Sequence, residues 1–137
     1  MKRIVVATDG SPGSRLASTR AIELARSTGA GITFVTVMHG PGFSSDPVSG
    51  QPAASAAGDE LAAVQEAVAE AEQVGVEADF QFVQGDAAKA IVDYAREHDA
   101  DLIVVGSRDL GSVKSLVLGS VSRDVVDHAD RPVLVVK

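Results

Sequence analysis

Short runs rich in Val and Ile alternate along the whole chain with longer segments of helical periodicity. This alternation is typical of a parallel sheet in which a helix connects each strand to the next. Because crossovers are right-handed, we expect an α/β fold with one doubly wound, five-stranded parallel sheet of order 3-2-1-4-5 and four helices. The predicted strands are Arg3–Ala7, Ile32–Met38, Val76–Val83, Leu102–Val105 and Val133–Val136.

Capping residues place the helices between these strands. Ser11 followed by Pro12 predicts the start of the first helix, and Gly29 its end. From His39 to Gly58 the sequence is rich in Gly, Pro, Ser and Ala, and we predict a flexible surface loop or lid there. The predicted helices are Gly13–Thr28, Asp59–Val74, Ala87–His98 and Ser120–Ala129.

Length and composition exclude several classes of protein. The 137 residues suit one domain, residues 1–137, and the absence of cysteine excludes disulfides and thiolate metal sites. No apolar run has the length of a signal peptide core or a membrane span. A net charge of −7 argues against non-specific binding to nucleic acid. We therefore expect a soluble, acidic, cytoplasmic protein with neither membrane nor nucleic acid as partner.

One part of the chain is strongly acidic. Asp59 to Asp79 contains seven acidic residues and no basic one. Such a run occurs either on an acidic surface that binds a partner or on a solvated helix face, and the solvated face is the commoner case. The sequence leaves both interpretations open.

The strand order predicts where a ligand would bind. In a sheet of order 3-2-1-4-5, strands 1 and 4 are neighbours at the point where the winding reverses, and ligands bind beyond the carboxyl ends of such strands. Those ends are Thr8-Asp9-Gly10 and Gly106-Ser107-Arg108, both polar and both containing glycine. Further along, Gly119-Ser120-Val121-Ser122 predicts a helix start, whose N–H groups and dipole favour an anion. We therefore predict a phosphate-bearing ligand at this edge of the sheet.

Familiar catalytic and nucleotide motifs are missing. No G-x-G-x-x-G follows the first strand, no glycine-lysine-Ser/Thr triplet indicates a P-loop, and no G-x-S-x-G indicates a nucleophile. His39, His98 and His128 are scattered without the spacing of metal ligands. The sequence therefore predicts neither catalytic side chains nor a metal site made of protein ligands.

These motifs together resemble the universal stress protein family over the whole chain. The resemblance rests on the opening IVVATDGS, the strand end VTVMH, the segment GSRDLGSVKSLVLGSVS and the closing RPVLVVK. The family's ATP-binding subgroup has the signature G-x-x-G, nine residues, then G-[ST], which aligns with Gly106, Asp109, Gly119 and Ser120. The resemblance implies a Rossmann-like, adenine nucleotide alpha hydrolase-like fold and binding of ATP, AMP or cyclic AMP.

The resemblance also implies roles for individual residues. Asp9 would hold the ribose hydroxyls, Ala7 and Thr8 would line the same site, and the backbone of Val37 would contact adenine. The phosphates would be surrounded by Gly106, Arg108, Asp109, Gly119, Ser120, Val121 and Ser122. Simpler structural roles stay open: Asp9 can form a turn before the Ser11 cap, the glycines can allow close packing, and Val37 can belong to the core.

Asp109 stands where the subgroup has its second glycine. Its carboxylate adds a negative charge to a loop expected to touch phosphates, and a like-charge contact at ~4 Å costs roughly 1 kcal/mol in water. A divalent cation such as Mg²⁺ between Asp109 and the phosphate oxygens would reverse that effect. The alternative is a nucleotide-free, dimeric interaction module whose ATP site is impaired by Asp109.

The last strand predicts a homodimer. In the order 3-2-1-4-5, Val133–Val136 is an apolar edge strand, which pairing with its copy across a two-fold axis would cover. We therefore expect a homodimeric, nucleotide-binding regulator of the stress response, with a protein client that the sequence does not identify. ATP hydrolysis would be slow at most, since a true ATPase would have only Asp9 and Asp109 as candidate groups.

Overall fold

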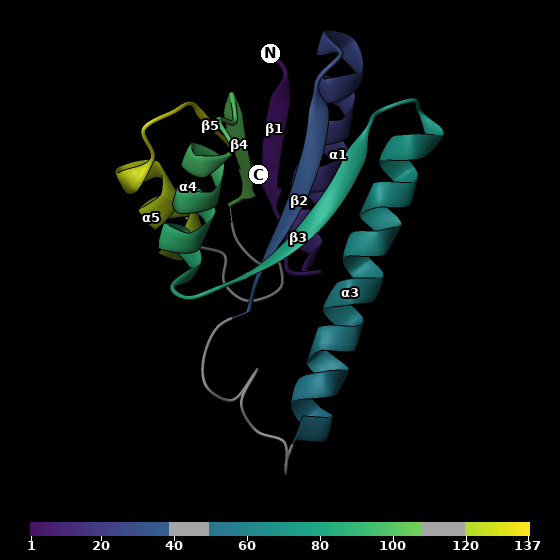
Figure 1. Ribbon diagram of the computed structural model, residues 1–137, viewed down its shortest axis with the longest axis vertical. Coiled ribbons are helices and arrows are strands. Elements are labelled where there is room, and N and C mark those ends of the chain that lie inside the picture. The colour runs from purple at the N-terminus through teal and green to yellow at the C-terminus, as the bar shows by residue number, and fades with distance from the viewer. Residues whose placement is uncertain (39–49, 108–119) are drawn as a thin grey trace.

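The computed structural model describes residues 1–38, 50–107 and 120–137, and these form one sheet flanked by helices (Figure 1). The sheet has five strands in the order β3-β2-β1-β4-β5, and all neighbouring pairs are parallel. The predicted fold class and strand order are confirmed. In chain order the elements are β1 (Arg3–Ala7), α1 (Pro12–Thr28), β2 (Gly31–Met38), α3 (Gly50–Gln73), β3 (Ala78–Gln84), α4 (Ala87–Glu97), β4 (Leu102–Gly106), α5 (Ser120–His128) and β5 (Val133–Val136).

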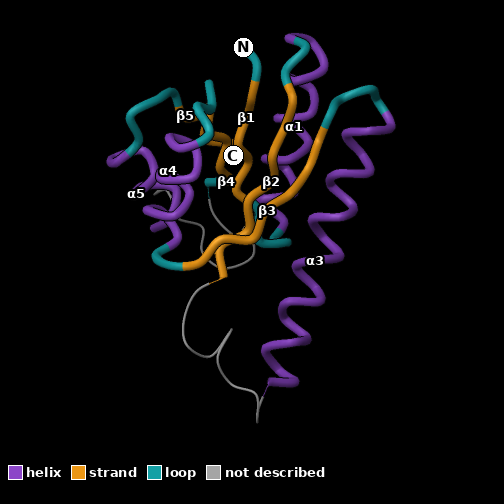
Figure 2. The backbone as a smooth tube through the Cα atoms, viewed as in Figure 1, coloured by secondary structure: helices purple, strands orange, loops and turns teal. Residues whose placement is uncertain are grey.

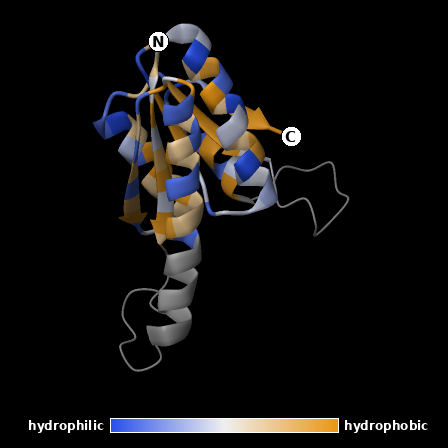
Figure 3. Ribbon diagram, turned by 90° about the vertical axis from the view of Figure 1, so that its right-hand side faces the viewer, coloured by the Kyte–Doolittle hydropathy of each residue, from blue (hydrophilic) through white to orange (hydrophobic). Residues whose placement is uncertain are grey.

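Helices flank the sheet on both faces (Figure 2), and alternate residues of a strand face opposite helix layers. Ile4 and Val6 of β1 belong to a buried cluster with α1 and α3, whereas Val5 between them belongs to a second cluster with α4 and α5. The central strands are buried on both faces, as a parallel sheet requires. Coloured by hydropathy, they stand out as hydrophobic between helices with mixed surfaces (Figure 3).

Both caps predicted for α1 are present, and α4 has a cap as well. Ser11 Oγ accepts a hydrogen bond from the Ser14 N–H at 3.3 Å, and Gly29 ends α1 with a left-handed φ of 79°. Asp86 caps α4 by accepting from the Lys89 N–H at 3.2 Å. No helix in residues 1–38, 50–107 and 120–137 is long and apolar enough to span a membrane.

The predicted loop from His39 to Gly58 is wrong in its second half. α3 begins at Gly50, so residues 50–58 are helical, and residues 39–49 lie outside the described part of the chain. Six of the nine residues from 50 to 58 are neither Gly nor Pro, and four of these six are alanine, the strongest helix former. Pro52 stands in the first turn, where its missing N–H has no intrahelical partner to lose. The other boundaries differ from the predicted ones by at most two residues.

Side-chain hydrogen bonds connect the segments at the amino ends of neighbouring strands. The Asp101 carboxylate accepts hydrogen bonds from the backbone N–H groups of Lys2 and Arg3 at 2.7 and 3.0 Å, and these bonds lower the pKa of Asp101. The buried Thr33 hydroxyl accepts from the Arg3 guanidinium at 2.7 Å and donates to Asp79 at 2.7 Å. A relay of side chains thus crosses β1, β2 and β3.

Arg131 performs the corresponding role beside β5. Its guanidinium donates to the carbonyl oxygens of Ala95 and Ala100 at 3.2 and 2.7 Å and to the Asp130 carboxylate at 3.0 Å. The hydrogen bond from Arg131 lowers the pKa of Asp130. Arg131 therefore holds the turn before β5 against the end of α4.

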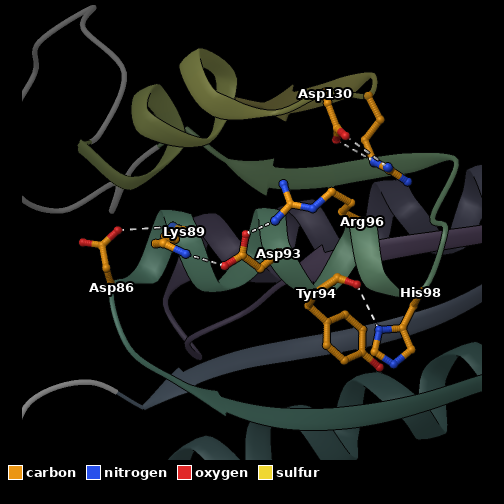
Figure 4. A network of polar contacts seen from close by, with 8 residues as sticks. Asp86, Lys89, Asp93, Tyr94, Arg96, His98 and Asp130 are labelled. Atoms are coloured by element: carbon orange, nitrogen blue, oxygen red, sulfur yellow. Dashed lines mark hydrogen bonds and ion pairs between the residues drawn. The ribbon is translucent and has the colours of Figure 1, made fainter.

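The exposed face of α4 carries a second polar network (Figure 4). Lys89 and Arg96 both pair with Asp93, and the hydrogen bond from Lys89 contributes most to lowering the pKa of Asp93. The Tyr94 and His98 rings stack with centroids 3.9 Å apart, and burial raises the pKa of Tyr94. The ion pairs and the ring stacking join i, i+3 and i, i+4 neighbours, whereas Asp79 of β3 also contributes to the raised pKa of Tyr94.

Candidate functional site

The carboxyl ends of β1 and β4 lie side by side, as the strand order predicts. Val6 of β1 pairs with Val104 of β4, and both strands end within two residues of this pair. Ala7, Thr8 and Asp9 leave β1 there, while Gly106 and Ser107 leave β4. The sheet therefore brings the two predicted polar ends to one place.

Asp9 forms the turn that leads into α1. Its carboxylate accepts a hydrogen bond from the Ser11 N–H at 2.9 Å, through Oδ1. The side chain is exposed, and in the described part of the chain no hydrogen bond or ion pair involves Oδ2. The structural role of Asp9 is thus present, and one carboxylate oxygen stays available to a ligand.

Ser14 organises the backbone behind Asp9. Ser14 is 7% exposed, and its hydroxyl donates to the Ser11 carbonyl at 3.0 Å and accepts from the Asp9 N–H at 3.3 Å. The Thr8 hydroxyl lies 3.4 Å from it. Ser14 was not among the predicted site residues, although its position three residues after the Ser11 cap is a sequence signal for it.

Gly106 lets β4 approach the start of α1. A Cβ at this position would lie 2.6 Å from the Gly13 carbonyl oxygen and 2.7 Å from its carbonyl carbon, closer than real Cβ atoms come to backbone. The close packing considered for this glycine is therefore present. It fixes the end of β4 against the first turn of α1, and so fixes the base of the candidate site.

Ser122 connects the start of α5 to the end of β4. Its hydroxyl is buried, with the residue 3% exposed, and donates to the Ser107 carbonyl at 3.0 Å. The Ser107 N–H donates in turn to Val136 of β5 at 2.8 Å. Because α5 begins at Ser120, this contact fixes the amino end of the helix, where N–H groups have no carbonyl partner within the helix, beside the carboxyl end of β4.

Ala7 and Val37 form an apolar wall on one face of the sheet. Both are partly buried against the cluster that contains α4 and α5. Thr8 lies on the other face, with its hydroxyl near Ser14, and its N–H donates to the Val35 carbonyl at 2.9 Å. Ala7 and Thr8 were predicted to line one site, and the structure places their side chains on opposite faces.

Only part of the predicted site lies in the described part of the chain. Ala7, Asp9, Val37 and Gly106 lie at the carboxyl edge of the sheet, and Val121, 40% exposed, lies in the first turn of α5. Three predicted residues, Arg108, Asp109 and Gly119, lie outside the described part of the chain, and Ser120 is described only as the first residue of α5. Within residues 1–38, 50–107 and 120–137, no group of three or more His, Asp or Glu is arranged to hold a metal ion.

Thr36 is a buried polar position that was not predicted from the sequence. It is 1% exposed near the carboxyl end of β2, and its hydroxyl has no hydrogen-bond partner in the part of the chain that the structure describes. Buried hydroxyls are normally hydrogen-bonded, so this oxygen marks a polar position on the α1 and α3 face. A threonine within an apolar strand gives no sequence signal for it.

Comparison with known proteins gives matches over the whole chain. The model of the universal stress protein family matches residues 1–137. The stress response protein NhaX of Bacillus subtilis is 32% identical over 161 aligned positions, which cover 98% of this chain and 97% of the relative. A universal stress protein solved in complex with cAMP is 30% identical, with a TM-score of 0.78 and coverage of 99% and 97% of the two chains. The Archaeoglobus fulgidus universal stress protein solved in complex with dAMP is 30% identical, with a TM-score of 0.76 and coverage of 100% and 98%.

Proposed function

Because the chain belongs to the universal stress protein family, we propose that it binds an adenine nucleotide at the carboxyl edge of β1 and β4 and acts as a stress-response regulator. One observation carries the proposal: Asp9, with one carboxylate oxygen available, and the amino end of α5 follow neighbouring strands. An acceptor-only carboxylate suits sugar hydroxyls, and a helix start suits a phosphate.

The two ligand-bound relatives support an adenine nucleotide over other phosphates. cAMP and dAMP share an adenine, a sugar and one phosphate. Each also keeps one free sugar hydroxyl, the 2′ in cAMP and the 3′ in dAMP, so a single acceptor such as Asp9 would serve both. We extend the proposal to AMP and ATP, which offer both hydroxyls.

Each described residue has a proposed contact. Asp9 accepts from the sugar hydroxyls, Ala7 and Val37 flank the adenine, and Thr8 contributes its backbone. Gly106 and the first turn of α5, with Ser120, Val121 and Ser122, approach the phosphates. The buried Ser122 hydroxyl stays with Ser107, so we assign its contribution to the backbone. We propose the same phosphate role for Arg108, Asp109 and Gly119, with Mg²⁺ between Asp109 and the phosphates when ATP binds.

The proposal also covers assembly and turnover. We propose a cytoplasmic homodimer that forms through β5, because Leu134 of this edge strand is 37% exposed and Val126 of the adjoining α5 is 44% exposed. Nucleotide occupancy would alter the surface seen by a protein client, with at most slow ATP hydrolysis. Occupancy, rather than turnover, is then the signal.

The test is calorimetric titration of nucleotide-stripped protein with AMP, cAMP and ATP, the last with and without Mg²⁺. Asp9→Asn keeps a side-chain oxygen for the Ser11 turn but removes the charge, so we expect the fold to persist and affinity to fall about 10- to 100-fold. Asp127→Asn, an exposed carboxylate on α5, is the matched control and should bind normally.

The alternative predicts a different result. If no nucleotide binds at millimolar concentration and none is carried through purification, the chain is a nucleotide-free interaction module. If Asp9→Asn binds as well as the unmodified protein, Asp9 only makes the turn and its assignment is wrong.

A further inference from the structure

The outer edge of β3 is a row of backbone groups that the sheet does not use. β3 hydrogen-bonds to β2 alone. The Ile32 N–H donates to the Glu77 carbonyl at 2.9 Å, which sets the alternation: Asp79, Gln81 and Val83 direct their backbone groups toward β2. The outward backbone groups therefore belong to Ala78, Phe80, Phe82 and Gln84.

This edge has little of the protection that edge strands usually have. The strand reads ADFQFVQ, without Pro or Lys, and its register with β2 is continuous from Ala78 to Gln84, without a bulge. Phe80 is 38% exposed, and Phe82, with its ring 5.8 Å away, is partly buried. In the described part of the chain, the one hydrogen bond to the outward groups is a 3.4 Å contact from the Gln81 amide to the Phe82 carbonyl. The edge is therefore open to an added strand.

The charge of the surrounding segment favours one kind of partner at this edge. From Ser27 to Ala88 the sequence has nine acidic residues and no Lys or Arg, so all 12 basic residues lie elsewhere. This segment supplies β2, α3 and β3, and Glu66, Glu70 and Glu72 of α3, like Glu77 and Asp79, are exposed. A second copy of the chain would bring acid against acid, which disfavours pairing of β3 with itself. A basic segment has the complementary charge.

We infer that the outer edge of β3 binds an extended basic segment of a partner protein, which adds to the sheet as a further strand. Strand addition of this kind gains affinity from main-chain hydrogen bonds and specificity from alternate side chains. The inference is independent of nucleotide binding, because β3 is separated from β1 by β2.

The two faces of β3 define the sequence of the partner. On the α3 face, Phe80 and Phe82 would lie beside the added strand, so its side chains there should be apolar. On the α4 face stand Gln81 and the exposed Asp79, whose Oδ1 accepts from Thr33. The Arg3 guanidinium donates to the same Thr33 hydroxyl, but Arg3 is half-buried whereas Asp79 is exposed. The expected partner therefore alternates basic and apolar residues.

Two labelled peptides test the inference: an acetylated octapeptide of alternating lysine and valine, and its glutamate-valine counterpart. By fluorescence anisotropy at low salt we expect the lysine peptide to bind at least about tenfold more tightly. Phe80→Pro removes one outward N–H from an edge position that tolerates proline, and should weaken binding about tenfold or more. The matched control, Phe80→Ala, keeps the N–H and should lose less affinity. Equal binding of both peptides, or equal effects of the two substitutions, would overturn the inference.

Amide hydrogen exchange in the unmodified protein keeps the test valid if Phe80→Pro does not fold. Free protein should exchange the outward amides of Phe80, Phe82 and Gln84 faster than those of Gln81 and Val83. With the lysine-valine peptide bound, the outward amides should become protected while the inward ones stay unchanged. Binding without this alternate pattern would mean that charge attraction alone holds the peptide, and strand addition would be wrong.

Discussion

The two edges of the sheet differ in length, charge and the way they are anchored. β3 has seven residues and lies in a segment without Lys or Arg, whereas β5 has four residues, VLVV, between Arg131 and Lys137. A β5 edge can meet its own copy without placing acid on acid, and a β3 edge cannot. The same parallel sheet thus offers one edge suited to self-association and another suited to a different, basic partner. Charge on the flanking residues, rather than strand geometry, makes this distinction.

The largest expected effect concerns self-association through β5. Leu134→Arg would place two like charges near the two-fold axis of the proposed dimer, at a cost of several kcal/mol, and weaken it about 100-fold or more. We expect a dimer to become a monomer in sedimentation equilibrium, with an unchanged circular dichroism spectrum. Phe80→Arg, the same change on the other edge strand, is the control and should leave the dimer intact. A dimer that survives Leu134→Arg and dissociates with Phe80→Arg would show that the chain self-associates through β3 and not through β5.

The next prediction compares the side-chain hydrogen bonds that anchor the two edges of the sheet, those of Arg131 beside β5 and those of Thr33 beside β3. Arg131→Met would leave the Ala95 and Ala100 carbonyls without the guanidinium, and we expect a loss of about 1–3 kcal/mol in the free energy of unfolding. Thr33→Val preserves shape and removes only the hydroxyl between Arg3 and Asp79, which we expect to cost about 1 kcal/mol. Urea denaturation measures both. A larger loss for Thr33→Val would show that the β3 edge is the more firmly anchored one.

The smallest effect is a difference in pH dependence. Burial raises the pKa of Tyr94 beside β3, with a further contribution from Asp79, so its stabilising contribution is complete below pH 10.0, the ordinary pKa, and declines as pH rises above it. The hydrogen bond from Arg131 lowers the pKa of Asp130, so that contribution is present above pH 3.8 and is lost as pH falls toward the lower folded value.

Urea midpoints measured from about pH 3 to about pH 11 should therefore distinguish the alkaline contribution of Tyr94 from the acid contribution of Asp130. Tyr94→Phe should flatten the alkaline limb alone. Asp130→Asn should flatten the acid limb in part, because the pKa values of Asp93 and Asp101 are lowered as well. If Tyr94→Phe changes the acid limb instead, the alkaline pH dependence assigned to Tyr94 is wrong.

The strand order and most helix bounds could be predicted because they depend on local patterns. Apolar runs, the Ser11 cap and Gly29 act within a few residues, and the structure confirms them. The α3 start was missed because Gly50, Pro52 and Gly58 are loop-forming residues by type, whereas their alanine-rich surroundings favour a helix. Local residue types conflict there, and capping does not decide between the two starts, because Ser49 and Asp59 are both residue types that cap helices.

The candidate site could also be predicted only in part, because some of its contacts join segments that are far apart in the chain. The meeting of the β1 and β4 ends follows from topology, so Asp9 and Gly106 could be placed from the sequence. The contact of Gly106 with Gly13 and the contact of Ser122 with Ser107 join segments far apart in the chain, and no periodicity encodes them. Likewise, Phe80 alternates like a core residue but is exposed, because β3 is an edge strand and lacks a neighbour on its outer side.

The central position of β1 has a consequence for synthesis on the ribosome. β1 pairs with β2 as soon as residue 38 is available, but its other partner, β4, begins only at residue 102. At about 5–20 residues per second, the nascent chain carries one unpaired apolar edge of β1 for about 3–13 seconds. The Asp101 carboxylate that holds Lys2 and Arg3 arrives equally late, 99 and 98 residues further along, respectively. The first strand to be made is thus among the last to be completed, and a chaperone that binds extended apolar segments would find it during this interval.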